Sequence, residues 1–72
     1  MIVYSPLWKT MKQKGITTYF LINKRGFSSS TIHSLKHNIG ITTTTINDLC
    51  NTLNCGVADI MEHIPDDKSY RN

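Results

Sequence analysis

Long apolar runs and targeting signals are missing from this 72-residue chain. No apolar run approaches the roughly 20 residues that cross a bilayer. The segment from Met1 to Leu7 lacks the basic start and the long apolar middle of a signal peptide. We therefore expect a soluble protein of the cytoplasm that has no membrane partner.

Cysteine is scarce, with Cys50 and Cys55 as its two occurrences. Structural zinc sites usually space their cysteines more closely, and no second pair is present. The alternative is a zinc site that combines both cysteines with His63. We favour two small, buried side chains in a reducing compartment. We therefore expect the protein to bind no metal ion and no cofactor.

The chain is too short for more than one small domain. At this length, folding buries only roughly 60% of the surface of the unfolded chain. The core is then thin and leaves little room for a deep pocket. We expect no small-molecule ligand and no enzymatic activity.

Acidic residues are absent from the first forty residues, although the whole chain has five. The basic residues of that half are Lys9, Lys12, Lys14, Lys24, Arg25 and Lys36. The acids all follow Gly40 and outnumber Lys68 and Arg71. A chain with one cationic and one anionic half is oriented by a polyanion such as DNA. The alternative is chance segregation of charge in a short chain.

A repeated pattern of helix starts runs through the chain. An apolar residue precedes a capping residue, and an aliphatic residue follows one turn later. The four cases are Ile16-Thr17 with Leu21, Phe27-Ser28 with Ile32, Ile41-Thr42 with Ile46, and Cys55-Gly56 with Ile60. The cap satisfies a free N–H of the first turn, and the two apolar residues pack together. An earlier helix is predicted where Ser5 caps and Pro6 takes the first helical position.

These starts predict an all-α fold of five helices, over residues 6–14, 18–24, 29–37, 43–53 and 57–63. The run Thr42 to Thr45 favours a strand weakly, but Ile46, Leu49 and Leu53 recur at helical spacing. We expect residues 2–4 to form a short extended arm. Residues 1–64 make up the domain, and 65–72 a flexible polar tail. The predicted core comprises Leu7, Met11, Ile16, Leu21, Ile32, Leu35, Ile46, Leu49, Leu53 and Ile60.

The turn at Gly26 separates two short helices. Glycine there supplies the positive φ of a tight turn, and Phe27 closes over it. Ile32 and Leu35 then attach the next helix to the core. This is the pattern of a helix-turn-helix, with the segment from Ser28 to Asn38 as the helix that enters the major groove.

The segment from Thr17 to Leu35 resembles the Cro/phage-repressor-like (XRE) helix-turn-helix family of small bacterial transcriptional regulators. The pieces Ser-x-x-Thr-Ile and, later, Thr-Ile-x-x-Leu-Cys occur in the family's order, and the resemblance covers nearly all of the chain except its polar tail. It implies a compact lambda-repressor-like DNA-binding domain. It also implies that the positions of Ser29, Ser30 and Ser34 face bases.

The outward face of the recognition helix is predicted from Ile32 and Leu35, which point inward. The predicted base contacts are Ser29, Ser30, His33 and Ser34. Serine pairs with several bases and discriminates weakly between them. We therefore expect sequence specificity to depend on DNA shape, on bridging water molecules or on the arm of residues 2–4. Ser28 is predicted to cap the helix and not to contact a base. For Ser30, the alternative to a base contact is the same local role, a side-chain hydrogen bond to the backbone of the cap or turn.

Phosphate contacts are predicted at both ends of the helix-turn-helix. They are Thr18, at a helix N-terminus that favours an anion, and Lys36, His37 and Asn38. Lys9, Lys24 and Arg25 are either further contacts or a solvated face.

The function we predict is a sequence-specific DNA-binding regulator, a repressor that binds double-stranded DNA as a homodimer. The acidic second half, and residues 2–4 as an edge strand, are candidates for the dimer interface. One alternative is a protein-interaction module, such as the antitoxin partner of a toxin pair. A second is Ser/His enzyme chemistry, but His33 and His37 share an exposed helix with no buried acid.

Overall fold

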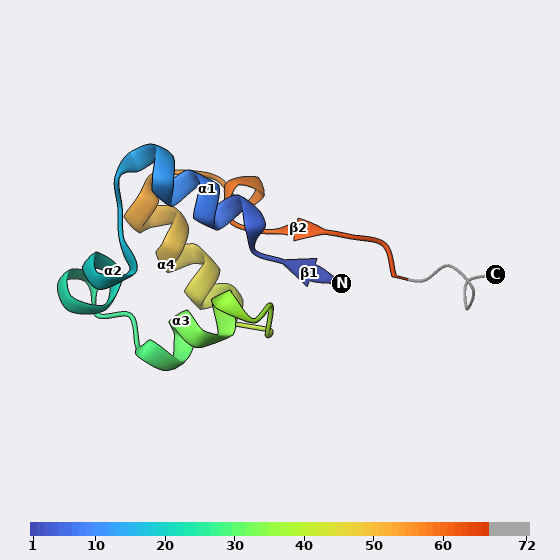
Figure 1. The fold of residues 1–72 in the computed structure, drawn as a ribbon, viewed down its shortest axis with the longest axis horizontal. Coiled ribbons are helices and arrows are strands. Elements are labelled where there is room, and N and C mark those ends of the chain that lie inside the picture. The colour runs from blue at the N-terminus through green and yellow to red at the C-terminus, as the bar shows by residue number, and fades with distance from the viewer. Residues whose placement is uncertain (67–72) are drawn as a thin grey trace.

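The computed structural model describes residues 1–66, and four α-helices make up most of this part of the chain. The elements in chain order are β1 (Ile2–Val3), α1 (Ser5–Lys14), α2 (Thr18–Arg25), α3 (Ser29–Lys36), α4 (Thr43–Leu53), the 3₁₀ helix η1 (Val57–Asp59) and β2 (Glu62–His63). Figure 1 shows the helices gathered together and the two strands extending to one side. None of the helices in the described part has the length and apolarity needed to cross a membrane.

Three of the predicted helix starts are confirmed in atomic detail. The side-chain oxygen of Thr17 accepts a hydrogen bond from Phe20 N–H at 3.1 Å. The oxygen of Ser28 accepts from Thr31 N–H at 3.0 Å, and that of Thr42 from Thr45 N–H at 3.2 Å. Each bond satisfies a first-turn N–H that has no partner within its helix. The capping pattern therefore located α2, α3 and α4 correctly.

The first helix starts one residue earlier than predicted. Tyr4, not Ser5, occupies the capping position, and it makes no side-chain cap. The N–H of Leu7 donates to the carbonyl of Tyr4 at 3.0 Å, which draws Ser5 into the first turn. Pro6 still lies in that first turn, where its missing N–H costs nothing.

The predicted fifth α-helix over residues 57–63 is wrong. The chain makes one short turn, η1, and then enters β2, which pairs antiparallel with β1. The carbonyl of Asp59 accepts a hydrogen bond from the Thr10 hydroxyl of α1 at 2.9 Å. Beyond it, Ile64 N–H donates to Met1 carbonyl at 2.8 Å. Backbone groups that a longer helix would use internally are thus bonded to distant segments.

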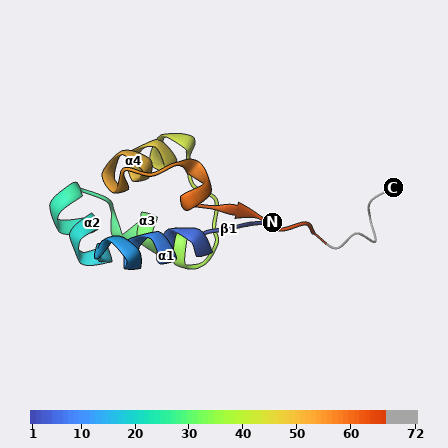
Figure 2. The ribbon, with the colours of Figure 1, turned by 90° about the horizontal axis from the view of Figure 1, so that it is seen from above.

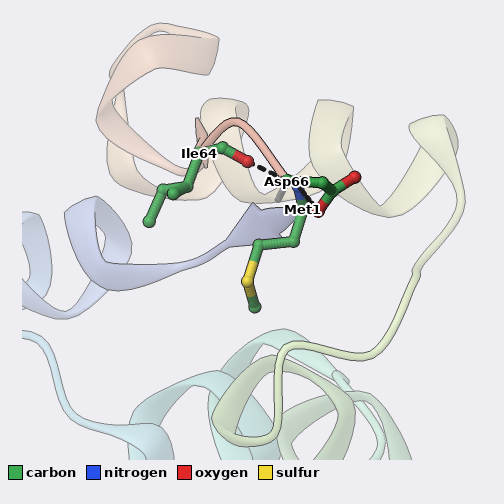
Figure 3. A network of polar contacts seen from close by, with 3 residues as sticks. All are labelled: Met1, Ile64 and Asp66. Atoms are coloured by element: carbon green, nitrogen blue, oxygen red, sulfur yellow. Dashed lines mark hydrogen bonds and ion pairs between the residues drawn. The ribbon is translucent and has the colours of Figure 1, made fainter. Parts of the chain in front are cut away.

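The predicted arm at residues 2–4 is extended at Ile2 and Val3 but not at Tyr4, which begins α1 as its N-cap. Ile2 lies opposite His63, and Val3 lies opposite Glu62. The amino group of Met1 bonds to the Ile64 carbonyl at 2.6 Å and pairs with Asp66 at 2.9 Å (Figure 3). Residues up to Asp66 are therefore held to β1, while 67–72 of the predicted tail lie outside the described residues.

The core lies between α1 and α4, with α2 and α3 closing it (Figure 2). The predicted core is confirmed except for Ile16, which is only partly buried and packs against its surface. Three buried residues were not predicted: Val3, Tyr4 and Thr10. Val3 and Tyr4 are buried because the arm is packed against the domain, and Thr10 because its hydroxyl is bonded to η1.

Candidate nucleic-acid interface

The second and third helices meet at a glycine turn that fixes their relative orientation. Gly26 ends α2 with a φ of 76°, a left-handed conformation that suits glycine. Phe27 N–H donates to the carbonyl of Leu21 at 3.0 Å, and the Phe27 side chain packs on the core. Ser28 then caps α3. The predicted helix, tight turn and helix are all present.

The inward face of α3 is anchored by two side chains. Leu35 is fully buried, and Ile32 is 5% exposed. Both belong to the main core cluster together with Leu21 of α2. Their position determines which side of α3 is turned outward, because residues three and four apart share one face of a helix.

The predicted base-contacting residues lie mostly on that outward side. Ser29, Ser30 and His33 are exposed. Ser34 is half-buried, and its carbonyl accepts hydrogen bonds from the N–H groups of His37 and Ile39. The outward face therefore consists of small hydroxyl groups around one imidazole, and Ser34 lies at its edge.

A second imidazole lies beside the first. His37 follows His33 by one helical turn, and the ring centroids are 4.3 Å apart with planes tilted by 38°. Both side chains are exposed, and His37 is the residue that ends α3. From the sequence, His33 was predicted as a base contact and His37 as a phosphate contact. Their close pairing follows from the four-residue spacing.

The end of α3 is held by the N-terminal strand. Asn38 adopts a left-handed conformation with φ of 55°, and its side-chain oxygen accepts from Tyr4 N–H at 3.1 Å. The Tyr4 hydroxyl donates to the carbonyl of Ile39 at 2.9 Å. Asn38 was predicted to bind phosphate, and the structure gives its side-chain oxygen an internal partner. Tyr4 was missed as a residue of this region, since no local pattern links it to Asn38.

The other predicted phosphate contacts lie at separate ends of the helix-turn-helix. Thr18 is the first residue of α2 and is half-buried, while Lys36 and His37 are exposed at the end of α3. Next to Thr18, the side chain of Tyr19 is 67% exposed. Tyr19 was not singled out from the sequence, although a phenol hydroxyl at a helix start suits a phosphate oxygen.

One of the undecided basic residues has an internal contact. The Arg25 guanidinium lies 5.7 Å from the ring centroid of Phe20, within the range of a cation–π interaction. This contact holds Arg25 beside its own helix, and it supports the interpretation of Arg25 as part of a solvated face.

The first three helices differ in charge from the rest of the described chain, although folding brings Asp48 near Arg25, and Asp59 and Glu62 near Lys9. The helices α1, α2 and α3 carry no acidic side chain, and the described acids are Asp48, Asp59, Glu62 and Asp66. Of these, Asp59 and Glu62 lie in η1 and β2. The outward face of α3 is therefore free of carboxylates on its own helix and on its partner α2, which favours an anionic ligand.

The two cysteines are free and half-buried rather than fully buried. Burial, and then the nearby Cys50 and Asp59, raise the pKa of the Cys55 thiol. Within residues 1–66, no three histidine, cysteine or acidic side chains gather as a metal site would require. The alternative zinc site of Cys50, Cys55 and His63 has no support in this arrangement.

Known proteins share this fold and sequence pattern. Residues 6–66 match the family of Cro/C1-type helix-turn-helix DNA-binding domains. A solved structure, described as the transcriptional regulator VanUg, is 31% identical with a TM-score of 0.82. The similarity covers 90% of this chain and 87% of that one. No curated protein matches the sequence.

Proposed function

The chain belongs to the Cro/C1-type helix-turn-helix family of DNA-binding domains, and on that premise we propose that it is a repressor that binds double-stranded DNA as a homodimer. Similarity to a transcriptional regulator over nearly the whole chain supports a role in transcription. Repression needs only that a site be occupied, whereas activation needs a further contact with the transcription machinery.

One observation carries the proposal: α3 presents a solvent-exposed face while its opposite face is locked into the core. Ile32 and Leu35 anchor it, and Ser28 caps its start. In our proposal, α3 enters the major groove, where a helix of this kind reads base edges with its N-terminal residues. The base contacts are Ser29, Ser30, His33 and Ser34.

The backbone of the DNA is held at two places in this arrangement. At the start of α2, Thr18 and the first-turn N–H groups meet one phosphate, because the helix dipole favours an anion there. At the end of α3, Lys36, His37 and Asn38 meet another. These contacts position the domain but carry no sequence information. Serine makes few bidentate base contacts, so DNA shape contributes to the choice of site.

The dimer interface we propose is the β1–β2 ribbon, which consists of the two strands and the flanking pair Met1 and Ile64. Three of its apolar side chains are exposed: Met1 by 53%, Ile2 by 40% and Ile64 by 41%. Ile39, exposed by 47%, belongs to the loop whose carbonyl binds Tyr4. Apolar side chains gathered on one projecting element favour burial against a second copy. The sequence suggested residues 2–4 as an edge strand of the interface, and in this proposal the strand β1 acts together with β2.

Selection of bound sequences from a random DNA pool tests this function directly. We expect enrichment of a short pseudo-palindrome whose half-sites lie about 10 base pairs apart or a multiple of that spacing. Recovery of no sequence above background would refute sequence-specific binding. Recovery of one unpaired half-site would leave DNA reading intact and reject the dimer.

A protein-interaction module is the second candidate, and a separate apolar hollow favours it. The hollow lies between α4 and the segment after it, and its apolar lining includes Ile46, Cys50, Val57 and Met61. Val57 is 51% exposed there. Nuclease-resistant co-purification of a protein partner, without any mobility shift of DNA, would favour this candidate over the repressor.

A further inference from the structure

The histidine pair of α3 has a spacing that fits a chelating group. His33 and His37 are four residues apart, so both rings lie on one face of the helix. Two imidazoles that share one ion at about a right angle, each with a metal–nitrogen bond of about 2.0–2.1 Å, have ring centroids about 4.5 Å apart. The centroids of these two rings are 4.3 Å apart.

The surroundings of the pair select the kind of ion. Both rings are exposed, and α1 to α3 contribute no carboxylate. Mg²⁺ and Ca²⁺ prefer oxygen ligands, especially carboxylates, and α1 to α3 supply no carboxylate to this face. Imidazole nitrogens suit Ni²⁺ and Cu²⁺, whose ligands lie at right angles, and paired histidines on one helical face are a recurrent metal-binding arrangement.

We propose that His33 and His37 form a chelating site for a divalent transition-metal ion of this group. Each imidazole donates one ring nitrogen, and water fills the other coordination positions, since no third ligand joins them within residues 1–66. The ion bridges two residues one turn apart, and its binding energy stabilises α3 in its helical form.

The consequence for DNA rests on the proposed function. If α3 lies in the major groove, the ring nitrogens that bind the ion are those that would face bases and phosphates. The ion and DNA then compete for the same two side chains. Metal binding itself is independent of this step and is measured without DNA.

Calorimetric titration with NiCl₂ tests the site on the full chain. Ni²⁺ is preferred to Cu²⁺ as the probe, because thiols reduce Cu²⁺. The reference protein carries Cys50→Ser and Cys55→Ser, so that neither sulfur supplies a ligand; if that pair unfolds, alanine replaces serine. We expect one Ni²⁺ per chain and a higher melting temperature when Ni²⁺ is present.

Three variants of the reference separate a chelate from single-histidine binding. His33→Ala and His37→Ala should each weaken Ni²⁺ binding by at least about tenfold, because the second nitrogen acts at high effective concentration. His63→Ala should leave binding unchanged. Ser29→His combined with His33→Ala keeps two histidines on α3 but about 12 Å apart along its axis, and it should behave as His33→Ala alone.

Clear results would overturn the site. No saturable binding by the reference would do so, as would equal affinities of the reference and His33→Ala. For the competition, affinity for a random-sequence duplex is measured with Ni²⁺ against the same concentration of Mg²⁺. We expect Ni²⁺, but not Mg²⁺, to weaken the affinity of the protein for DNA. Equal effects of the two ions on that affinity would reject competition. Ni²⁺ binding by a chain that binds no DNA would uphold the site and refute the proposed function.

Discussion

Tyr4 and Asn38 are 34 residues apart in sequence, and Tyr4 N–H donates to the Asn38 side-chain oxygen at 3.1 Å. The same tyrosine is 2% exposed, and its hydroxyl donates a hydrogen bond to the carbonyl of Ile39, the residue that follows Asn38. Together these bonds attach the N-terminal strand to the loop that ends α3. The end of the proposed recognition helix is thus held by a residue outside the helix-turn-helix, in addition to the anchors Ile32 and Leu35.

Removal of the Tyr4 hydroxyl should destabilise the domain measurably. Tyr4→Phe deletes the bond to the Ile39 carbonyl and keeps the buried ring, so we expect a loss of about 1 kcal/mol in the free energy of unfolding. Tyr19→Phe is the matched control, because that side chain is 67% exposed, and it should change stability by less than about 0.5 kcal/mol. Urea denaturation measures both, and equal effects would contradict the role given to Tyr4.

The cap of α3 should contribute to stability by a similar amount. Ser28→Ala removes the acceptor of Thr31 N–H and the contact between the Ser28 and Thr31 hydroxyls at 2.9 Å. The expected cost is about 1 kcal/mol. Ser30→Ala is the control, since Ser30 is exposed at the second position of the helix and is not its cap. A melting curve of Ser28→Ala that superimposes on that of the parent would contradict this cap.

DNA binding should weaken with salt in proportion to the phosphate contacts. The logarithm of affinity should fall linearly with the logarithm of salt concentration, by about 0.9 per contact. Lys36→Ala should reduce that slope by about 1 and weaken binding to all sequences alike. Ser34→Ala should instead change which sequences are preferred. Fluorescence anisotropy across a salt series measures both effects, and binding that is indifferent to salt would exclude the proposed DNA complex.

The ribbon should control association of two copies. Ile2→Ser and Ile64→Ser remove exposed apolar surface, and each should weaken the dimer by roughly tenfold or more, as follows from the burial of one aliphatic side chain. Val57→Ser, on a different exposed apolar position, should leave it unchanged. Sedimentation equilibrium measures the dissociation constants. A parent chain that stays monomeric at high concentration and on DNA would reject the dimer.

Stability should fall in alkaline solution because of Cys55. Its pKa is raised above the ordinary value of 9.0, chiefly by burial, so the folded state holds the thiol proton more tightly than the unfolded state does. The resulting stabilisation is complete below pH 9.0 and is lost as pH rises through the raised pKa. Cys55→Ser should flatten this part of the pH profile, as measured by denaturation midpoints. An unchanged profile would show that Cys55 is not the group responsible.

Local interactions account for what could be predicted from the sequence. A cap bonds to a backbone N–H three residues away, as at Thr17, Ser28 and Thr42, and an apolar residue recurs every three or four positions along a helix. These rules also oriented α3, because Ile32 and Leu35 face the core. The family resemblance, based on the same segments, was correct as well.

The tertiary structure decided the segments whose partners are distant in sequence. Cys55, Gly56 and Ile60 follow the helix-start pattern, yet only a 3₁₀ turn forms, because Thr10 takes the Asp59 carbonyl and β1 takes the backbone after it. The sequence placed Tyr4 in an extended arm and Asn38 at the end of the recognition helix, and only folding brings the two residues together. The sequence by itself determined the helix-turn-helix, since its information lies within one or two turns. Only long-range packing could determine the ribbon and the anchorage of α3, since each depends on chain segments that meet after collapse.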